Sequence, residues 1–325
     1  MSGPRAWRSR REIPPAEPAS ALAGVPAAVP DPQPTAPATA RRLLVAALVT
    51  AVLAAAVFLL AVHTALGQRF DNAALLGSYG QRDQTRISEL SLLRRITVTT
   101  SIIALAAIAL LGIIRRRPRL GIATAVMAAL VIGVTHILRT TILTRPRLVQ
   151  SDSLYPFNTF PSGHTAVAFS VALALVIVSP PAWRGISAVV AGSYAWLTAV
   201  AVQSARWHRP SDAIGAALLT FAALCLVAAL LAARRPVSVG RRYAHIPAFA
   251  VLGIVWVVAA ILSTINAVRV LRFLVDHNDT FTPTQPILNA AYLCSVNLTV
   301  VVVVTLLATL LVLLGRVDLD QPGRR

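Results

Sequence analysis

Residues 161–179 read PSGHTAVAFSVALALVIVS, so a short polar stretch opens directly onto an apolar run. A helix that begins here would leave its first backbone N–H groups unpaired beside Ser162, Gly163 and His164. The apolar part is short for a membrane span, which takes about 20 residues, but its Ala, Val and Leu content favours crossing. The stretch therefore predicts a membrane helix with a polar entrance.

Similar apolar runs lie on both sides of this one. They cover residues 43–66, 96–114, 120–143, 185–205, 212–233, 246–267 and 287–315. The chain of 325 residues is 56% hydrophobic and only 13% charged, which leaves too little polar surface for a soluble protein. The pattern predicts an all-α fold, a polytopic membrane helical bundle with a six-span core at 41–235 and two additional transmembrane helices at 236–316.

Both ends of the chain are predicted to be tails. Residues 1–40 are rich in Pro and Ala and cannot bury enough surface to fold, which indicates a disordered cytoplasmic tail. Residues 317–325 follow the last span and are predicted to be a second cytoplasmic tail.

The arginines predict the orientation in the membrane. The formal net charge is +18, but basic residues punctuate apolar runs instead of clustering on a soluble domain, so we expect no nucleic-acid partner. With the N-terminus inside, the inner segments carry Arg115, Arg116, Arg117, Arg119, Arg184, Arg234, Arg235, Arg241, Arg242 and Arg316. This excess is typical of cytoplasmic loops. We expect a multi-pass protein of the plasma membrane with both termini cytoplasmic, and the sequence leaves its oligomeric state open.

Three polar stretches interrupt the central spans, at residues 139–146, 161–164 and 208–212. Alternation of the spans puts all three on the outer side, where a bundle can gather them into one cup. The cup would contain two histidines, one carboxylate and several guanidiniums, without the spaced ligands of a metal site. Its chemistry indicates an anion, and we expect no metal and no other cofactor.

Each stretch suits a phosphate group. The guanidiniums of Arg139 and Arg145 offer planar forks of donors to its oxygens. The helix start at Ser162 and Gly163 favours anions through its free N–H groups. A carboxylate such as Asp212 on one nitrogen of His208 would leave the other nitrogen as a nucleophile.

His164 is the second histidine of this cup, and a third histidine lies nearby. His164 could give a proton to a leaving alkoxide, since imidazole titrates near pH 6.5. His136 lies one helical turn before Arg139 and is a candidate helper.

Each residue taken alone also has a structural explanation. Arg139 could be a snorkelling side chain at the membrane boundary. Asp212 could be an ordinary first-turn carboxylate, and His164 a satisfied helix-end histidine. Their predicted convergence favours function, because ionisable groups at membrane depth are unfavourable and usually functional.

At these residues the chain resembles the type 2 phosphatidic acid phosphatase superfamily, which includes lipid phosphate phosphatases, bacterial acid phosphatases and vanadium haloperoxidases. Its signatures are a Lys followed by Arg-Pro, then Pro-Ser-Gly-His, then Ser-Arg with a downstream His and Asp four residues apart. Residues 161–164 match the second signature, and His208 with Asp212 keeps the spacing of the third. The resemblance covers about residues 95–233.

The resemblance implies metal-independent hydrolysis of a membrane lipid phosphate or diphosphate at the outer membrane face. His208 would attack phosphorus to form a phosphohistidine, Asp212 would orient His208, and His164 would protonate the departing group. The phosphoryl oxygens would be held by Arg139, Arg145, Ser162 and Gly163.

Two positions depart from the signatures. Arg139 replaces the Lys and lies one residue closer to Arg145 than the usual spacing, and Val202 stands where the third signature has arginine. Arg206 or Arg209, on either side of His208, could supply the missing phosphate contact. The alternatives are a non-catalytic lipid-binding or lipid-transporting relative of the same fold and, with a similar pocket, a haloperoxidase.

Overall fold

The computed structural model describes residues 36–80, 83–149, 157–234, 238–239, 245–276, 283–315 and 317–319. The fold below is that of residues 34–325, which form one compact unit. Most of the predicted N-terminal tail lies outside the described residues. Its last part, residues 36–40, already belongs to the first helix.

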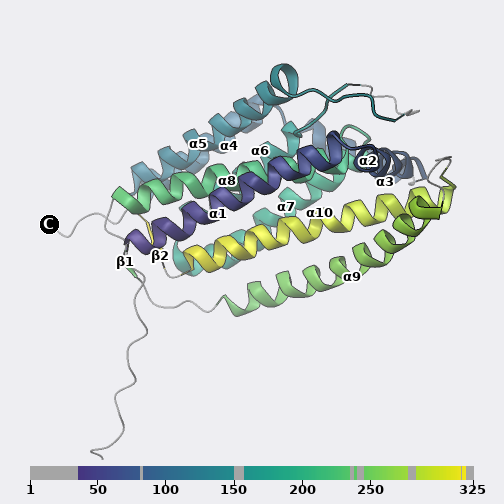
Figure 1. Cartoon of the computed structure of the whole chain (residues 1–325). Helices are drawn as coiled ribbons and strands as arrows, with labels where there is room; N and C mark the ends of the chain where they lie inside the picture. Colours follow the sequence, from purple (N-terminus) through teal and green to yellow (C-terminus); the bar gives the residue numbers. More distant parts are fainter. Residues whose placement is uncertain are drawn as a thin grey trace, which may run out of the picture. The chain divides into compact units, whose positions relative to one another are not determined.

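The described chain is almost entirely helical (Figure 1). Its α-helices are α1 (Ala36–Val57), α2 (Ala65–Gly77), α3 (Asp83–Arg94), α4 (Val98–Ile114), α5 (Pro118–Ile137), α6 (Gly163–Val178), α7 (Arg184–Ser204), α8 (Pro210–Arg234), α9 (Ile246–Asp276) and α10 (Gln285–Leu314). One π-helical turn each extends α1 (η1, Phe58–Val62) and α5 (η3, Leu138–Ile142), and short 3-10 turns lie at η2 (Ser78–Gly80) and η4 (Pro181–Trp183). All apolar runs expected to cross the membrane are helical, which confirms the all-α polytopic bundle.

Six of the described helices are long and apolar enough to cross a membrane: Ala36–Val62, Pro118–Ile142, Pro181–Ser204, Pro210–Arg234, Ile246–Leu274 and Gln285–Leu314. The other two predicted spans are shorter. The α4 segment forms a bent pair with α3 at an angle of 62°, and α6 has 16 residues. The eight predicted spans thus divide into six long helices and two short ones.

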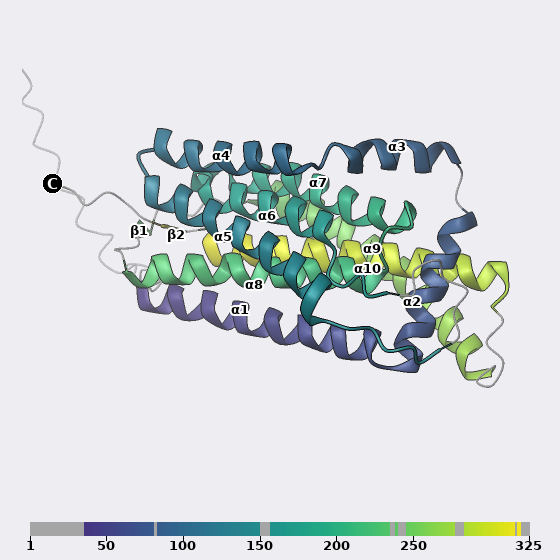
Figure 2. The ribbon, with the colours of Figure 1, turned by 90° about the horizontal axis from the view of Figure 1, so that it is seen from above.

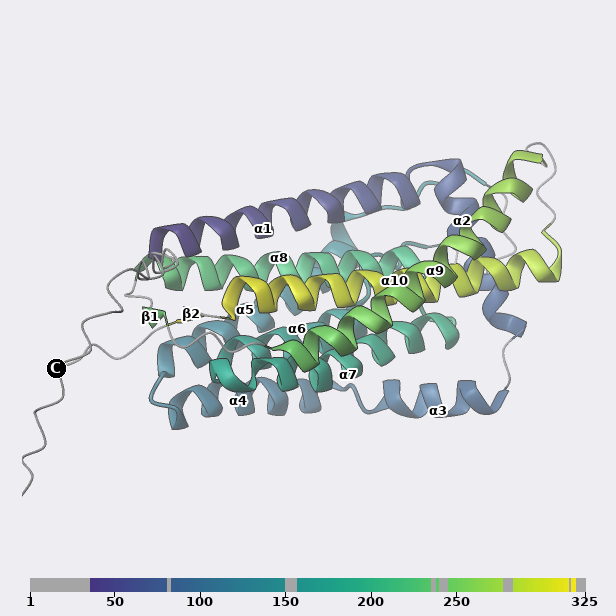
Figure 3. The ribbon, with the colours of Figure 1, turned by 90° about the horizontal axis from the view of Figure 1, so that it is seen from below.

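Helix α8 occupies the centre of the bundle. In an apolar 18-residue stretch of α8, 67% of the residues are buried, whereas the corresponding stretches of α1 and α9 are each 22% buried. Helix α1 lies along α8 (Figure 2), and α9 packs on α10 (Figure 3). Many outward apolar side chains of α1 and α9 are exposed, among them Leu48, Val52, Ile254 and Ile261. Such surfaces fit contact with lipid chains.

One end of the bundle is closed by the C-terminal residues. Strand β2 (Val317–Asp318) pairs antiparallel with β1 (Ser238–Val239). The Asp318 carboxylate forms a salt bridge with Arg117, at the start of α5, and the buried Arg184 guanidinium donates to the carbonyl oxygens of Leu314 and Val317. Residues 317–319 therefore pack on the bundle, although they were predicted to begin a tail.

Helix α2 lies at the other end, away from β1 and β2 (Figure 1). It crosses α10 so closely that a Cβ atom added at Gly77 would lie 2.0 Å from the carbonyl oxygen of Leu288. A backbone carbonyl within a helix cannot move aside as a side chain can. Gly77 therefore lets α2 dock on the last helix.

We expect Gly77→Ala to destabilise the protein by about 1–3 kcal/mol, because it overpacks a backbone contact. Thermal unfolding of the purified protein in detergent measures this. Gly133→Ala is the matched control: a Cβ there meets nothing within 4 Å, so its melting temperature should stay unchanged or rise slightly. Equal melting temperatures for both variants would contradict the close approach of α2 and α10.

Candidate active site

A histidine just before α8 and a carboxylate in its first turn lie next to each other. The Nδ1 atom of His208 lies 3.3 Å from Oδ2 of Asp212, four residues later, and both side chains are buried. The same oxygen accepts hydrogen bonds from the Thr159 hydroxyl at 2.6 Å and from the backbone N–H of Arg209 at 2.9 Å. With Nδ1 donating to the carboxylate, the Nε2 atom carries the imidazole lone pair.

The start of α6 is fixed to the same place. Ser162 is the N-cap, with its hydroxyl accepting from the N–H of Thr165 at 3.4 Å. Its own N–H donates to the carbonyl oxygen of Asp212 at 2.9 Å. Of the first-turn N–H groups, those of Gly163 and His164 lack intrahelical acceptors. The buried Ser162 side chain thus acts as a helix cap, and the anion-binding donors are its two successors.

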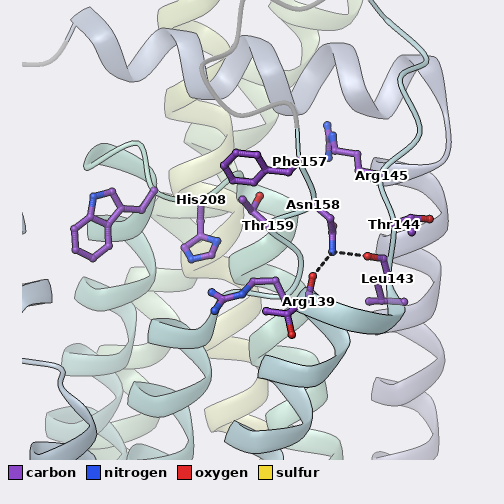
Figure 4. Close-up of a pocket in the computed structure, with 10 residues that line it drawn as sticks. Arg139, Leu143, Thr144, Arg145, Phe157, Asn158, Thr159 and His208 are labelled. Carbon is purple, nitrogen blue, oxygen red and sulfur yellow. Dashed lines mark hydrogen bonds between the residues drawn. The ribbon is translucent and has the colours of Figure 1, made fainter.

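Arg139 reaches over this helix start from η3. A Cβ atom at Gly163 would lie 3.6 Å from Nη1 of Arg139. The other guanidinium nitrogen, Nη2, lies 3.4 Å from Nδ1 of His136, the predicted helper. Figure 4 shows the Arg139 guanidinium directed toward His208. The Arg139 guanidinium therefore lies at van der Waals distance over the start of α6.

His164 also lies beside this group. Its ring packs against the indole of Trp207, the residue before His208, with 5.1 Å between ring centroids. It interacts electrostatically with His208 and Arg139. The structure therefore gathers both predicted histidines around one guanidinium.

A cavity of about 610 Å³ opens in front of these residues (Figure 4). It is lined by Arg139, Thr140, Leu143, Thr144, Arg145, Phe157, Asn158, Thr159, Trp207 and His208. The Asn158 amide holds its wall together by donating to the carbonyl oxygens of Arg139 and Leu143 at 3.2 and 3.1 Å. Asn158 and Thr159 contribute to the site although no sequence motif indicated them.

Arg145 lines the cavity and is held from behind by a helix outside the predicted site. Its Nη1 atom lies 3.5 Å from Oδ2 of Asp71, on α2, and both side chains are buried. Burial raises the pKa of Asp71 to about 6, against the opposing effect of the Arg145 charge. Asp71 was not among the predicted site residues, and its partners lie far away in the sequence.

The two candidates for the missing arginine differ in position. Arg209 is buried, and its guanidinium donates to Thr159 Oγ1 at 3.3 Å and to Asn72 Oδ1 at 3.2 Å. Burial, followed by the nearby Arg145 charge, lowers the pKa of Arg209. Arg206 has a positive φ of 67° and places its guanidinium 3.6 Å from the centroid of the Tyr79 ring.

Arg206 does not line the cavity, so it contributes no donor there. Val202 is fully buried in an apolar cluster with Leu93 and Ala199, so it adds no polar contact. Among the described residues, no three His, Cys, Asp or Glu side chains gather in a way that could hold a metal ion.

Fold and site together define a helical membrane protein with a histidine–carboxylate pair and arginines around an anion-sized cavity. The family model of the PAP2 superfamily matches residues 136–236, from the end of α5 to just beyond α8. The matched region contains the three motifs that resembled this superfamily, and the match supports a phosphatase-type activity in general terms. Comparison with curated proteins and with solved structures gave no match.

Thr159 offers a test of the buried carboxylate. We expect Thr159→Val to lower the kcat of phosphate release by about 10-fold or more, because a hydrogen bond to a charged group contributes about 1.5–3 kcal/mol. Thr140→Val is the matched control, since Thr140 lines the same cavity but donates its hydroxyl to the backbone oxygen of His136. Equal rates in the two variants would contradict a role of Thr159 in orienting Asp212.

Proposed function

We propose that the protein hydrolyses a membrane lipid phosphate or diphosphate without a metal, through a phosphohistidine, at the outer membrane face. The observation that carries this proposal is the buried His208–Asp212 pair, whose reactive nitrogen is available beside the Arg139 guanidinium. An imidazole oriented by a carboxylate is an activated nucleophile. Guanidiniums and helix N–H groups stabilise the charge that develops on phosphoryl oxygens.

The proposed reaction has two steps. First, Nε2 of His208 attacks phosphorus, the bond to the lipid oxygen breaks, and His164 gives its proton to the departing alkoxide. Next, a water attacks phosphorus and gives a proton to His164, while the P–N bond breaks and its electron pair returns to His208. Both histidines thereby regain their starting states, and inorganic phosphate leaves.

A second cavity supports a lipid substrate. It has a volume of about 340 Å³ and shares Arg139 with the first. Its polar end is lined by His136, Arg139, Gly163 and His164, and its walls are mainly apolar side chains of α4, α5 and α6, including Ile102, Leu105, Ala129, Ile132 and Val167. An acyl or prenyl chain attached to a phosphate fits this combination. The leaving lipid oxygen would then lie on the His164 side of phosphorus.

Arginine positions support the proposed orientation. Arg117 and Arg184 contact the C-terminal residues near β2, at the bundle end opposite α2 (Figure 1). An excess of arginine is typical of the cytoplasmic side. The proposal therefore places both termini in the cytoplasm and the cavities toward the outer leaflet of the plasma membrane.

His208→Ala should lower phosphate release by at least about 1000-fold, because the covalent step loses its nucleophile. Detergent-purified protein is assayed with a panel of lipid phosphates in the presence of a chelator. His63→Ala is the control, since His63 packs edge-on against Phe58. Full activity of the His208 variant, or loss of wild-type activity with the chelator, would remove the mechanism.

Ala129→Phe tests the lipid cavity. We expect at least about a tenfold lower kcat/KM for a long-chain lipid phosphate, because the added ring fills the apolar part of the cavity, while a short water-soluble phosphate ester is hydrolysed at the wild-type rate. Ala107→Phe places the same ring on an exposed position of α4 and should leave both substrates unaffected. Parallel losses on both substrates would argue against a lipid chain in this cavity.

One observation favours a second candidate, a non-catalytic lipid-binding relative. Val202 is buried in an apolar cluster and Arg206 stacks on Tyr79, so the arginine of the third signature has no counterpart in the cavity lining. This candidate predicts lipid binding that survives His208→Ala, with no turnover in either form. Vanadate-dependent halide oxidation would instead indicate a haloperoxidase.

A further inference from the structure

One face of α2 points into the protein behind the larger cavity. Gln68, Asp71 and Asn72 follow the i, i+3, i+4 spacing of a single helical face, and all three are buried. The helix lies outside residues 136–236, which carry the family match. Its buried polar face is therefore an addition to the matched region.

Gln68 fixes the loop that carries Arg145. Its Nε2 atom donates to the carbonyl oxygen of Pro146 at 2.6 Å, and its Oε1 atom accepts from the N–H of Leu148 at 3.3 Å. The backbone on the C-terminal side of Arg145 is thus tied to α2. A rigid backbone lowers the entropy that the long Arg145 side chain loses on binding.

Asp71 contacts the Arg145 side chain and the start of α8. Its Oδ2 atom lies 3.5 Å from Nη1 of Arg145 and accepts from the hydroxyl of Ser211 at 2.5 Å. Its Oδ1 atom accepts from the N–H of Ser211 at 3.3 Å. Ser211 immediately precedes Asp212. One carboxylate therefore connects a predicted phosphate ligand to the helix turn of the His208–Asp212 pair.

One guanidinium nitrogen of Arg145 has no hydrogen-bond partner among the described residues. This atom, Nη2, is buried. Arg145 lines the larger cavity and is held by Asp71, so its guanidinium is a donor already in place for a phosphoryl group there. Such preorganised donors stabilise a transition state without reorganising.

We propose that Asp71 is a positioning residue of this site, which holds the Arg145 guanidinium in place for the phosphoryl group and is itself held by the docking of α2 on α10. The proposal rests on the proposed function, because it assigns Arg145 to the bound phosphate. It also gives the C-terminal span α10, outside the family match, a role: the close approach of Gly77 to Leu288 sets the place of α2.

The charge on Asp71 responds to pH. The groups that face it are Arg145 from the loop after α5, Arg209 from the α7–α8 loop, and Ser211 and Asp212 from α8. Its pKa of about 6 means that Asp71 is ionised at pH 7.5 and mostly protonated at pH 5. Protonation removes the negative charge opposite Arg145, so the positioning is present above pH 6 and lost as the pH falls through 6.

A double-mutant cycle tests the proposal. Asp71→Asn should lower kcat/KM at pH 7.5 by about tenfold or more in the wild-type background, because the guanidinium loses its orientation. In the Arg145→Gln background the same change should cost less than about twofold, because the guanidinium is already absent and the amide oxygen introduced by Asp71→Asn can still accept from Ser211. A merely structural role would lower activity by the same factor in both backgrounds, and this outcome would overturn the proposal.

Ser78→Ala is the control for α2. Ser78 is as buried as Asp71, but its hydroxyl donates to the Leu75 carbonyl at the end of the same helix, so kcat/KM should stay within about twofold of wild type.

A second measurement needs no change at Asp71. The ratio of kcat/KM between wild type and Arg145→Gln should fall by about fivefold from pH 7.5 to pH 5, because most wild-type molecules then lack the positioning carboxylate. Substrate ionisation cancels in this ratio. A ratio that stays constant would overturn the proposal even if Asp71→Asn does not fold.

The outcomes separate this proposal from the function on which it rests. If wild type binds vanadate but releases no phosphate from any lipid, the proposed function fails. The same double-mutant cycle can then be measured with vanadate dissociation constants in place of kcat/KM, and it still reports the coupling between Asp71 and Arg145. Turnover with an additive cycle would leave the proposed function intact and remove only the role of Asp71.

Discussion

The arrangement of the site depends on the buried carboxylate of Asp212. A charge removed from water inside a helical bundle is unfavourable unless hydrogen bonds and opposite charges compensate it. Its Oδ2 atom accepts from His208, from Thr159 and from the backbone of Arg209, and its carbonyl oxygen accepts from Ser162. The hydrogen bonds to Asp212 therefore bring together the start of α8, the loop before α6 and the cap of α6.

The membrane helices could be predicted because each carries its own signal, an apolar run of sufficient length. Helix α6 was short in the sequence and remains short in the structure, where its buried face compensates for the missing length. Helix α2 gave no such signal. Its polar face is satisfied by Arg145, Arg209 and Ser211, which lie more than 70 residues away, so only the folded chain shows why Asp71 is buried.

The contacts of the site likewise include local ones, which the sequence can indicate, and distant ones, which it cannot. The His208–Asp212 pair and the Ser162 cap are both local contacts between residues three or four positions apart. The sequence predicted the first, whereas Ser162 was expected to hold phosphate and instead caps α6. Arg206, two residues before His208, was one of the two candidates for the missing phosphate contact. Its positive φ turns the chain, and the guanidinium stacks on Tyr79 instead, so proximity in sequence did not decide its direction.

The balance of charge around the larger cavity bears on how the proposed reaction turns over. The guanidiniums of Arg139, Arg145 and Arg209 are opposed by the carboxylates of Asp71 and Asp212, so the positive excess among these residues is small. A large excess would bind substrate, transition state and phosphate product alike, and uniform binding does not raise kcat. The buried carboxylates instead orient the guanidiniums and reduce the net positive charge that attracts every bound anion alike. In the proposed mechanism, selectivity for the transition state then comes from donor geometry, which the loop after α5 and the first turns of α6 and α8 keep fixed.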